Sequence, residues 1–463
     1  MVDFLYATIL PWLLKKIASF AGCVSWQGFS VSYADGGVIT GLRWMKLRQL
    51  KLLAASHGEK KREVACRVCR GNRLVCIKSS CPILLRTLAC VDVSKQLDRT
   101  SFFGATPPAV FVGQWGYPKV LTGPLVPALP VSDAAIMDTP ESWLEKSFEE
   151  LIRYRFSLVR GKTPIHVKSA RLPSGALLAI QESVLSAKPA DMEVWLKKKP
   201  LLRMLLSPRE APVGPSAPLE RVKLTDNPSV PRALERAVGD EDLRANTAVF
   251  ELYRSKISQR QLVRALSAGL LGVKAERRLV PTEWSITAVD DILGRALHQK
   301  VLDYAEINEY WVAGHEALAN SVQILFLPTP WMYEALEGWT FLPHESPASD
   351  FELAKGRKDY PRNVVGAYHA VRLPILEFLH GTNRQAGAVA FLEVRNEWIP
   401  LGVWRFREIA REALRKPILR FNRLHEALEE IARRLTTPMD QWLNSSRLVP
   451  YHVSQQNLQQ YFT

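Results

Sequence analysis

Four cysteines close together carry the most specific chemistry in this chain of 463 residues. Cys66 and Cys69 are followed by Cys76 and Cys81. Four thiolates at this spacing can close a tetrahedral zinc site, and a Cys-x2-Cys hook is the usual half of one. Two disulfides are the alternative, but such crowded bridges would be strained, and nothing marks the chain for an oxidising compartment. The spacing predicts a structural zinc site, because protein ligands fill all four positions.

Three arginines lie in the same short segment, at Arg67, Arg70 and Arg73. They could contact phosphate groups, or they could form the solvated face of a small zinc knuckle. The net charge of +15 and the pI near 9.6 favour a polyanionic partner, and nucleic acid is the commonest one. A charge that serves solubility, or a thermophile's surface, would give the same total.

Carboxylates in the last third of the chain could hold a second kind of metal. Asp350 and Glu352 precede Arg357, and Glu393 stands two residues before Arg395. Two or three such carboxylates could hold Mg²⁺ or Mn²⁺ for phosphodiester hydrolysis while basic groups clamp phosphate. The set is similar to the metal triad of restriction-type nucleases, although its spacing is wide and arginine stands where lysine is usual. The alternative is an ion-pair network between two packed layers.

Other catalytic signatures are missing from the sequence. It contains no P-loop, no Gly-x-Gly-x-x-Gly and no Gly-x-Ser-x-Gly, so nucleotide hydrolysis and serine chemistry have no support. The hydrophobic content of 47% and the charged content of 23% are those of an ordinary soluble globular protein. We therefore expect a cytoplasmic protein without a membrane partner.

The C-terminal tail carries the pattern Gln-x-x-Leu-x-x-Tyr-Phe, formed by Gln455, Leu458, Tyr461 and Phe462. On a helix the last three would share one side. A free tail gains nothing from an exposed aromatic pair unless a groove receives it. The pattern resembles the peptide by which DNA repair and replication proteins bind the sliding clamp PCNA. That resemblance implies a hydrogen bond from Gln455 and an apolar pocket for the other three; packing on the chain's own domain is the alternative.

The first half of the chain is expected to form short strands and helices. We expect two strands around the Gly-Gln-Trp-Gly turn at 113–116, followed by helical segments. Asp290 and Asp291 end a strand-like run and are expected to cap the helix that follows. The expected ranges are 110–112 and 119–121 for strands, and 143–158, 191–198 and 231–271 for helices, the last in at least two pieces broken near Ser255.

In the second half, apolar runs at 322–327 and 388–398 predict buried strands. Residues 331–339 predict a short aromatic helix on which Glu334 and Glu337 would face the same way. Beyond the second strand we expect a helix that carries Arg405, Arg407 and Arg411. A basic amphipathic helix at 414–435 and a polar linker at 436–454 are expected after it. Together the elements predict a mixed α/β or α+β body of two domains.

The N-terminus differs from the rest of the chain. The apolar run at 4–14 is too short to span a bilayer, and it lacks the features of a secretory signal. We expect residues 1–44 to be a start-site artefact or a dispensable extension, with a membrane anchor as the less favoured alternative. The expected domains are an N-terminal extension and basic segment at 1–60, an N-terminal domain at 61–275 with the zinc knuckle at 66–81, a C-terminal domain at 276–440, and a linker with the clamp peptide at 441–463.

Several longer stretches resemble one family. The segments 277–294 and 111–120, with the four cysteines and the clamp peptide, are similar to the archaeal Nre DNA-repair proteins over roughly residues 60–463. The resemblance implies a role in DNA repair alongside PCNA, with a zinc-bearing N-terminal domain and a separate C-terminal domain. It also implies an arginine between Thr282 and Trp284, where this chain has Glu283; if that arginine touches phosphate, the contact is lost or moved here.

The combined expectation is a DNA repair protein that binds branched or damaged DNA through its basic surface. The clamp peptide would raise its effective concentration on DNA already threaded through PCNA. Two mechanisms compete: a metal-dependent, structure-specific nuclease, and a non-catalytic recognition or adaptor factor. A third hypothesis, an RNA-binding zinc protein, fits the charge and the cysteines but leaves the clamp peptide unexplained.

Overall fold

Two six-stranded sheets organise the part of the chain that the computed structural model describes. That part comprises residues 87, 91, 93–129, 131–202, 214–341, 345–397 and 401–459, with 455–459 described by their backbone alone. All of these residues belong to one unit that begins at Leu53. Within these ranges, no helix has both the length and the apolar character needed to cross a membrane. The mixed α/β class expected from the sequence is confirmed.

The first sheet has the strand order β1-β5-β6-β4-β3-β2, and only the β4–β6 pair is parallel. The strands expected at 110–112 and 119–121 are confirmed as β2 and the start of β3. The helix expected at 191–198 is wrong, because this stretch is β5, in which Met192, Val194 and Leu196 are buried alternately. The bounds are β1 Ser101–Thr106, β2 Val110–Val112, β3 Lys119–Pro127, β4 Leu158–His166, β5 Ala190–Leu196 and β6 Ser216–Leu224.

Helices follow and interrupt this sheet. The expected helical region 231–271 is confirmed in three pieces, with Ser255 at the end of the second. The helix expected at 143–158 begins later, because Ser147 Oγ accepts a hydrogen bond from the Glu150 N–H, and the Glu150 carboxylate accepts one from the Ser147 N–H. The bounds are α5 Phe148–Phe156, α6 Ala176–Leu185, α7 Arg232–Gly239, α8 Ala245–Arg254 and α9 Gln259–Ser267, with short 3₁₀ turns at Ala135–Asp138, Pro140–Ser142, Val167–Arg171 and Lys274–Glu276.

The second sheet has the order β10-β9-β11-β8-β7-β12, with β9 and β11 parallel and the other pairs antiparallel. The buried strands expected at 322–327 and 388–398 are confirmed as β8 and β11, although β11 ends at Val394. The helix expected at 331–339 is wrong. This stretch is β9, which is paired on both sides, so the alternation of a strand turns Glu334 and Glu337 to opposite faces. The bounds are β7 Tyr310–Ala317, β8 Asn320–Leu327, β9 Met332–Trp339, β10 Ala348–Glu352, β11 Gly387–Val394 and β12 Leu419–Phe421.

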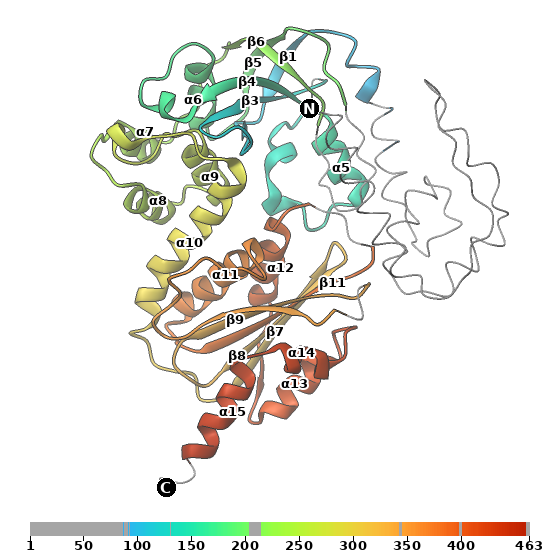
Figure 1. The fold of residues 1–463 in the computed structure, drawn as a ribbon, viewed down its shortest axis with the longest axis vertical. Coiled ribbons are helices and arrows are strands. Elements are labelled where there is room, and N and C mark those ends of the chain that lie inside the picture. Colours follow the sequence, from blue (N-terminus) through green and yellow to red (C-terminus); the bar gives the residue numbers. More distant parts are fainter. Residues whose placement is uncertain are drawn as a thin grey trace, which may run out of the picture. The chain divides into compact units, whose positions relative to one another are not determined.

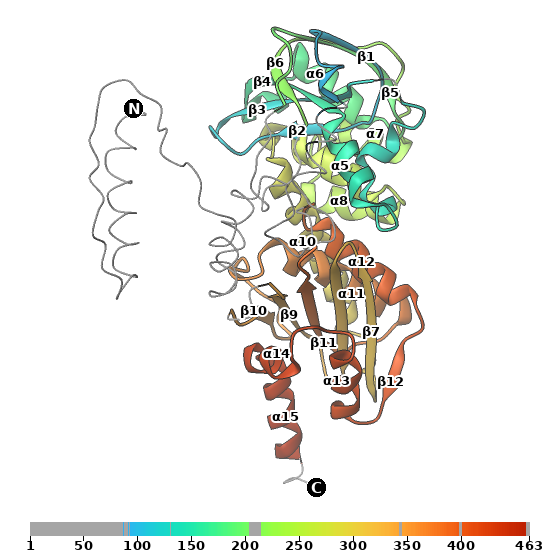
Figure 2. The same ribbon diagram turned by 90° about the vertical axis from the view of Figure 1, so that its right-hand side faces the viewer.

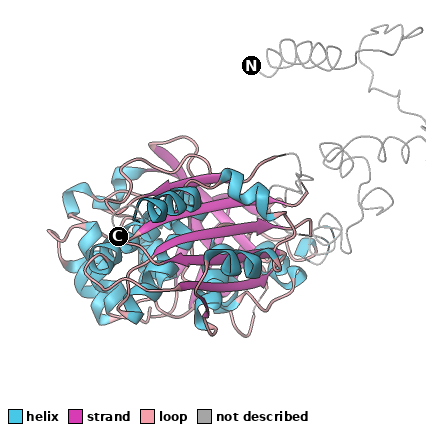
Figure 3. Ribbon diagram, turned by 90° about the horizontal axis from the view of Figure 1, so that it is seen from below, coloured by secondary structure: helices cyan, strands magenta, loops and turns pink. Residues whose placement is uncertain are grey.

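Helices cover both faces of this second sheet, which is why β8 and β11 are buried along their whole length. In Figure 1, α11 and α12 lie on one side of its strands and α13 to α15 on the other; Figures 2 and 3 show the same layers from the side and from below. Phe326 packs in the first layer and Leu325 in the second. The bounds are α10 Thr282–Val301, α11 Gly366–Thr382, α12 Trp404–Arg415, α13 Leu424–Ala432, α14 Met439–Ser445 and α15 Leu448–Gln459.

Two C-terminal expectations are wrong because both segments pair with or pack against the second sheet. The expected helix 414–435 is interrupted by β12, which pairs with β7. The expected linker 436–454 instead forms α14 and most of α15, and both pack against β9. Trp442 and Leu448 are buried in this layer. Burying the apolar side chains of these two residues against the sheet stabilises the fold, so the segment packs on the sheet and does not remain a free linker.

Helix α10 connects the two parts of the molecule, since it contacts α8 and α9 on one side and α11 on the other. The expectation that Asp290 and Asp291 cap a helix is wrong, because both lie inside α10. Asp290 is buried there and accepts two hydrogen bonds from Arg407 Nη1 on α12, at 2.8 and 2.9 Å. The three arginines expected on one helix beyond the second strand are confirmed on α12.

Candidate functional site

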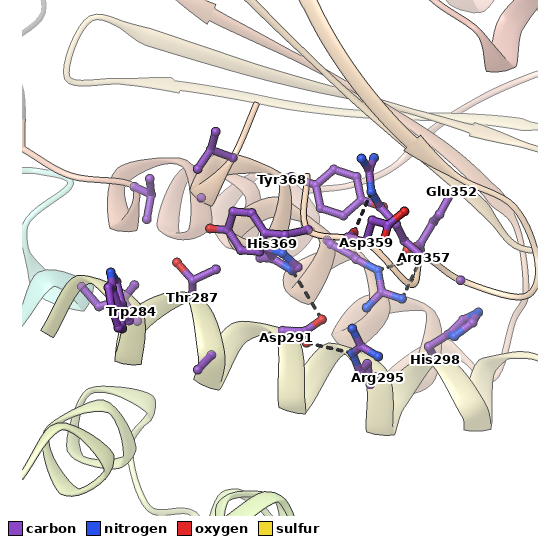
Figure 4. A pocket seen from close by; sticks show the side chains of 18 of the residues that line it. Trp284, Thr287, Asp291, Arg295, His298, Glu352, Arg357, Asp359, Tyr368 and His369 are labelled. Atoms are coloured by element: carbon purple, nitrogen blue, oxygen red, sulfur yellow. Dashed lines mark hydrogen bonds and ion pairs between the residues drawn. The ribbon is translucent and has the colours of Figure 1, made fainter. Parts of the chain in front are cut away.

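A cleft of about 1000 Å³ lies between α10, the segment after β10 and the first turn of α11. One wall is a stripe on α10, because its lining side chains recur every three or four residues and therefore share one face of the helix. Figure 4 shows this stripe along the helix, formed by Trp284, Thr287, Asp291, Arg295 and His298. The opposite wall contains Arg357, Asp359, Tyr360, Tyr368 and His369.

Glu352 holds the inner end of the cleft together. It lies at the end of β10, almost fully buried, and pairs with Arg372 at 2.7 Å between Oε1 and Nη2. The same carboxylate accepts hydrogen bonds from Trp331 Nε1 and Tyr368 Oη, both at 2.9 Å. Burial and the neighbouring Glu352 charge raise the pKa of Tyr368, so its hydroxyl stays a donor.

Asp350 fixes the wall that follows β10. Its carboxylate accepts backbone N–H bonds from Asn363 at 2.7 Å and Val364 at 2.8 Å, and it pairs with Arg357 Nη1 at 2.9 Å. These donors bring the chain back toward the strand and so hold Arg357, which lies over the Tyr368 ring at 5.8 Å. Asp350 therefore shapes the cleft from outside its lining.

The structure does not bring the four expected catalytic residues together. Glu393 pairs with Gly338 in register, on the sheet face that carries Leu336, whereas Asp350 pairs with Ala335 on the other face. The Glu393 carboxylate accepts N–H bonds from Thr436 and Thr437, at 2.9 and 2.7 Å. Arg395 binds Glu393 and Glu316 at the same end of the sheet. Among the described residues, no group of three or more His, Cys, Asp or Glu is arranged to hold a metal ion.

Three buried side chains on the cleft wall keep unused hydrogen-bonding atoms. His369 is 7% exposed, His298 3% and Arg372 4%. Both ring nitrogens of His369, Nε2 of His298 and Nη1 of Arg372 have no hydrogen-bond partner among the described residues. Burial lowers the pKa of His298 and lowers that of His369 to about 4, so both rings are neutral at physiological pH. Most buried polar atoms in proteins are paired, so this concentration around one cleft requires an explanation.

Aromatic and basic side chains surround the mouth of the cleft. Trp284 and Tyr360 line it and are about half exposed. Tyr117 packs on Trp284, with ring centroids 5.9 Å apart, and Trp115 in the same turn is exposed. Gly116 in that turn has φ +83°, a backbone conformation that residues other than glycine rarely adopt. The two exposed lysines of the mouth are Lys355 and Lys358.

The sequence reasoning identified few residues of this cleft. Glu352 and Arg357 were singled out and do line it. Asp291 was expected only as a helix cap, and Glu283 only as a departure from the family pattern. The remaining lining residues were not expected as site residues, although the recurrence of polar and aromatic residues along α10 was a usable signal once 282–301 is taken as one helix. Glu283, where the family resemblance implies arginine, is exposed in the first turn of α10 and lines the cleft beside Trp284.

Two other expected sites lie largely outside the described residues. The four expected zinc ligands and the three arginines between them fall outside: Cys66, Cys69, Cys76, Cys81, Arg67, Arg70 and Arg73. In the clamp pattern, Gln455 and Leu458 belong to α15, which is described there by its backbone alone, while Tyr461 and Phe462 are not described.

Comparisons with known proteins agree with one another. Residues 75–343 match a family model described as Archaeal Nre, N-terminal, and residues 352–461 match one described as Archaeal Nre, C-terminal. DNA repair protein NreB of Archaeoglobus fulgidus is 34% identical over 391 residues, which are 83% of this chain and 96% of that protein. DNA repair protein NreA of Haloferax volcanii is 35% identical over 327 residues, 68% of this chain and 78% of that protein. No solved structure gives a significant match.

Proposed function

The chain belongs to the archaeal Nre family, and on that premise we propose that it is a DNA repair protein that binds DNA at the cleft beside α10. The observation that carries the repair role is the similarity, over most of the chain, to relatives named DNA repair proteins. The cleft supports the DNA contact. Half-exposed rings stack on unpaired bases, and exposed lysines meet the phosphates, which is the chemistry that single-stranded nucleic acid requires.

Within DNA repair, the side-chain contacts favour a recognition factor over a nuclease. Asp350, Glu352 and Glu393 each accept at least three hydrogen bonds or ion pairs from protein donors. A carboxylate that is occupied in this way has few lone pairs left for Mg²⁺ or Mn²⁺. Because Glu393 also lies on the other face of the sheet, a cutting site built on all three would need the sheet to rearrange.

Recruitment by PCNA and a structural zinc site complete the proposal. Gln455, Leu458, Tyr461 and Phe462 would bind the clamp, which would raise the local concentration of a weak DNA-binding body without new DNA contacts. Zinc on the four cysteines would fold the segment that carries Arg67, Arg70 and Arg73, and these arginines would add phosphate contacts.

The test of this proposal uses the full chain with single-stranded, forked, flap and duplex DNA, in Mg²⁺ or Mn²⁺, with and without PCNA. We expect binding of branched and single-stranded DNA that falls steeply with salt. No cleavage should occur in the wild type or in Asp350→Asn, which keeps the shape of the carboxyl group. Metal-dependent cleavage by the wild type that Asp350→Asn abolishes would contradict the recognition role and establish the nuclease.

Two further measurements separate the parts. Substituting both Tyr461 and Phe462 by Ala should abolish binding to PCNA and leave DNA binding unchanged. Elemental analysis of the purified chain should find about one zinc per chain, as a four-cysteine site requires, and Cys66→Ser should remove it. Stoichiometric disulfides in place of zinc would contradict the metal site.

A further inference from the structure

We propose that the cleft receives a single unstacked nucleotide of a DNA strand, with its base against Tyr360 and His369 and its phosphate toward Lys355 and Lys358. This inference rests on the DNA binding proposed above and specifies which part of the DNA enters the cleft. The ligand class is a deoxynucleotide in its extruded or single-stranded form.

The first support is hydrogen-bonding capacity that the described residues leave unused around the cleft. Leaving a buried polar atom without a partner costs about 1–3 kcal/mol. Four such atoms lie in His298 on α10 and in His369 and Arg372 on α11. A neutral imidazole offers one donor and one acceptor. The edge of a nucleobase presents the same two kinds of group side by side, so a base could pair with atoms that the protein leaves unused.

The second support is the distribution of charge along the cleft. At the inner end each carboxylate already has a basic partner, because Asp291 pairs with Arg295 at 2.8 Å and Glu352 pairs with Arg372 at 2.7 Å. A phosphate group there would meet balanced charges and neutral histidines. We therefore place the phosphate at the mouth, where the ammonium groups of Lys355 and Lys358 are exposed beside Asp359.

The third support is the ring that covers this position. The Tyr360 ring lies 5.5 Å from the His369 ring, centroid to centroid, at 36°, and 54% of Tyr360 is exposed. An exposed ring beside buried, unpaired nitrogens provides a stacking surface and a polar edge at one place. The volume of about 1000 Å³ is at the upper end for pockets that hold small molecules, so it leaves room for one nucleotide with its sugar and phosphate.

The experiment is photocrosslinking of the full chain to a single-stranded oligonucleotide with one 5-iododeoxyuridine. We expect the crosslinked peptide to contain Tyr360 or Trp284. Free 5-iododeoxyuridine monophosphate, in a parallel arm, should crosslink only at far higher concentration, because it lacks the strand's phosphate contacts. Equal crosslinking of the free nucleotide would overturn the assignment to a DNA strand, and would make the cleft a site for free nucleotides.

Variants make the test specific. Tyr360→Ala and His369→Phe should each weaken binding of single-stranded DNA by about tenfold, the order expected for loss of one stacked base, and should leave duplex binding unchanged. Phe103→Ala, at an equally exposed ring on β1 (57%), should change neither. Because Tyr360 is exposed, its variant should fold even if His369→Phe does not.

The outcomes of the inference and of the proposed function are distinguishable. If DNA binds but crosslinks map outside the cleft, both the nucleotide site and the placing of DNA at this cleft are wrong, while DNA binding by the chain stands. If crosslinks map to the cleft but Tyr360→Ala binds single-stranded DNA like the wild type, only the nucleotide site is wrong. If the wild type binds no DNA of any form, the proposed function itself fails.

Discussion

His369 on α11 faces Asp291 on α10 across the cleft, with 3.5 Å between Nδ1 and Oδ1. The pair brings together two helices that four strands of the second sheet, β7 to β10, separate in the sequence. Because the histidine is buried and its ring nitrogens lack hydrogen-bond partners among the described residues, its protonation is tied directly to the folded state.

His369 should make the fold sensitive to acid. Burial lowers its pKa from 6.5 to about 4, against the opposing effect of Asp291. Between these values the unfolded chain binds more protons than the folded one, so the free energy of unfolding falls as the pH falls from 6.5 toward 4. Between pH 7 and pH 5, the free energy of unfolding of His369→Phe should fall by roughly 1–2 kcal/mol less than that of the wild type, as measured by urea unfolding. His425→Phe, at an exposed histidine on α13, is the control and should follow the wild type.

Glu352 should contribute strongly to the stability of the fold. Glu352→Ala leaves the buried Arg372 without its counter-ion and removes the acceptor for Trp331 Nε1, so the free energy of unfolding should fall by about 3–5 kcal/mol. The comparison is Glu412→Ala, which breaks the exposed pair with Arg415 and should cost no more than about 1 kcal/mol. Equal stability of the Glu352→Ala variant and the wild type in thermal denaturation would contradict a scaffolding role.

Gly294 should be required for Arg372 to reach the cleft. A Cβ at this position of α10 would lie 2.7 Å from Arg372 Nη1. Gly294→Ala should therefore displace the guanidinium, lower the free energy of unfolding by roughly 1–3 kcal/mol and weaken single-stranded DNA binding. Gly381→Ala on α11, where a Cβ meets nothing within 4 Å, should stabilise the chain by up to about 1 kcal/mol. The same gain at both glycines would show that the contact with Arg372 is unimportant.

Glu337 should produce the opposite pH dependence. Burial raises its pKa to about 7, against the effect of Arg405 and a hydrogen bond with Trp339. Between 4.5 and about 7 the folded chain binds more protons than the unfolded one, so stability falls as the pH rises through this window. Glu337→Gln imitates the protonated carboxyl and should exceed the wild type in stability by roughly 1–3 kcal/mol at pH 8, with little difference at pH 5. Parallel pH profiles for the two proteins would refute this.

Several local elements and the family could be predicted from the sequence. The apolar run at 322–327 could only be buried, and it is β8. The break at Ser255 separated α8 from α9 as its pattern indicated. The long motifs indicated the archaeal Nre family, which the comparisons confirmed. These features depend on residues close together in the chain, whose hydrophobic period and turn chemistry can be recognised without knowing what they pack against.

Which side chains share a site depends on tertiary contacts that the sequence did not reveal. Glu334 and Glu337 looked like neighbours on a helix, yet pairing of β9 with β10 and β11 turned them to opposite faces. Glu393 was assigned to the same centre as Asp350, and strand register placed it on the other face of the sheet. The cleft itself forms because α10 packs on α11. Register and helix packing are contacts between distant segments, and no local pattern encodes them.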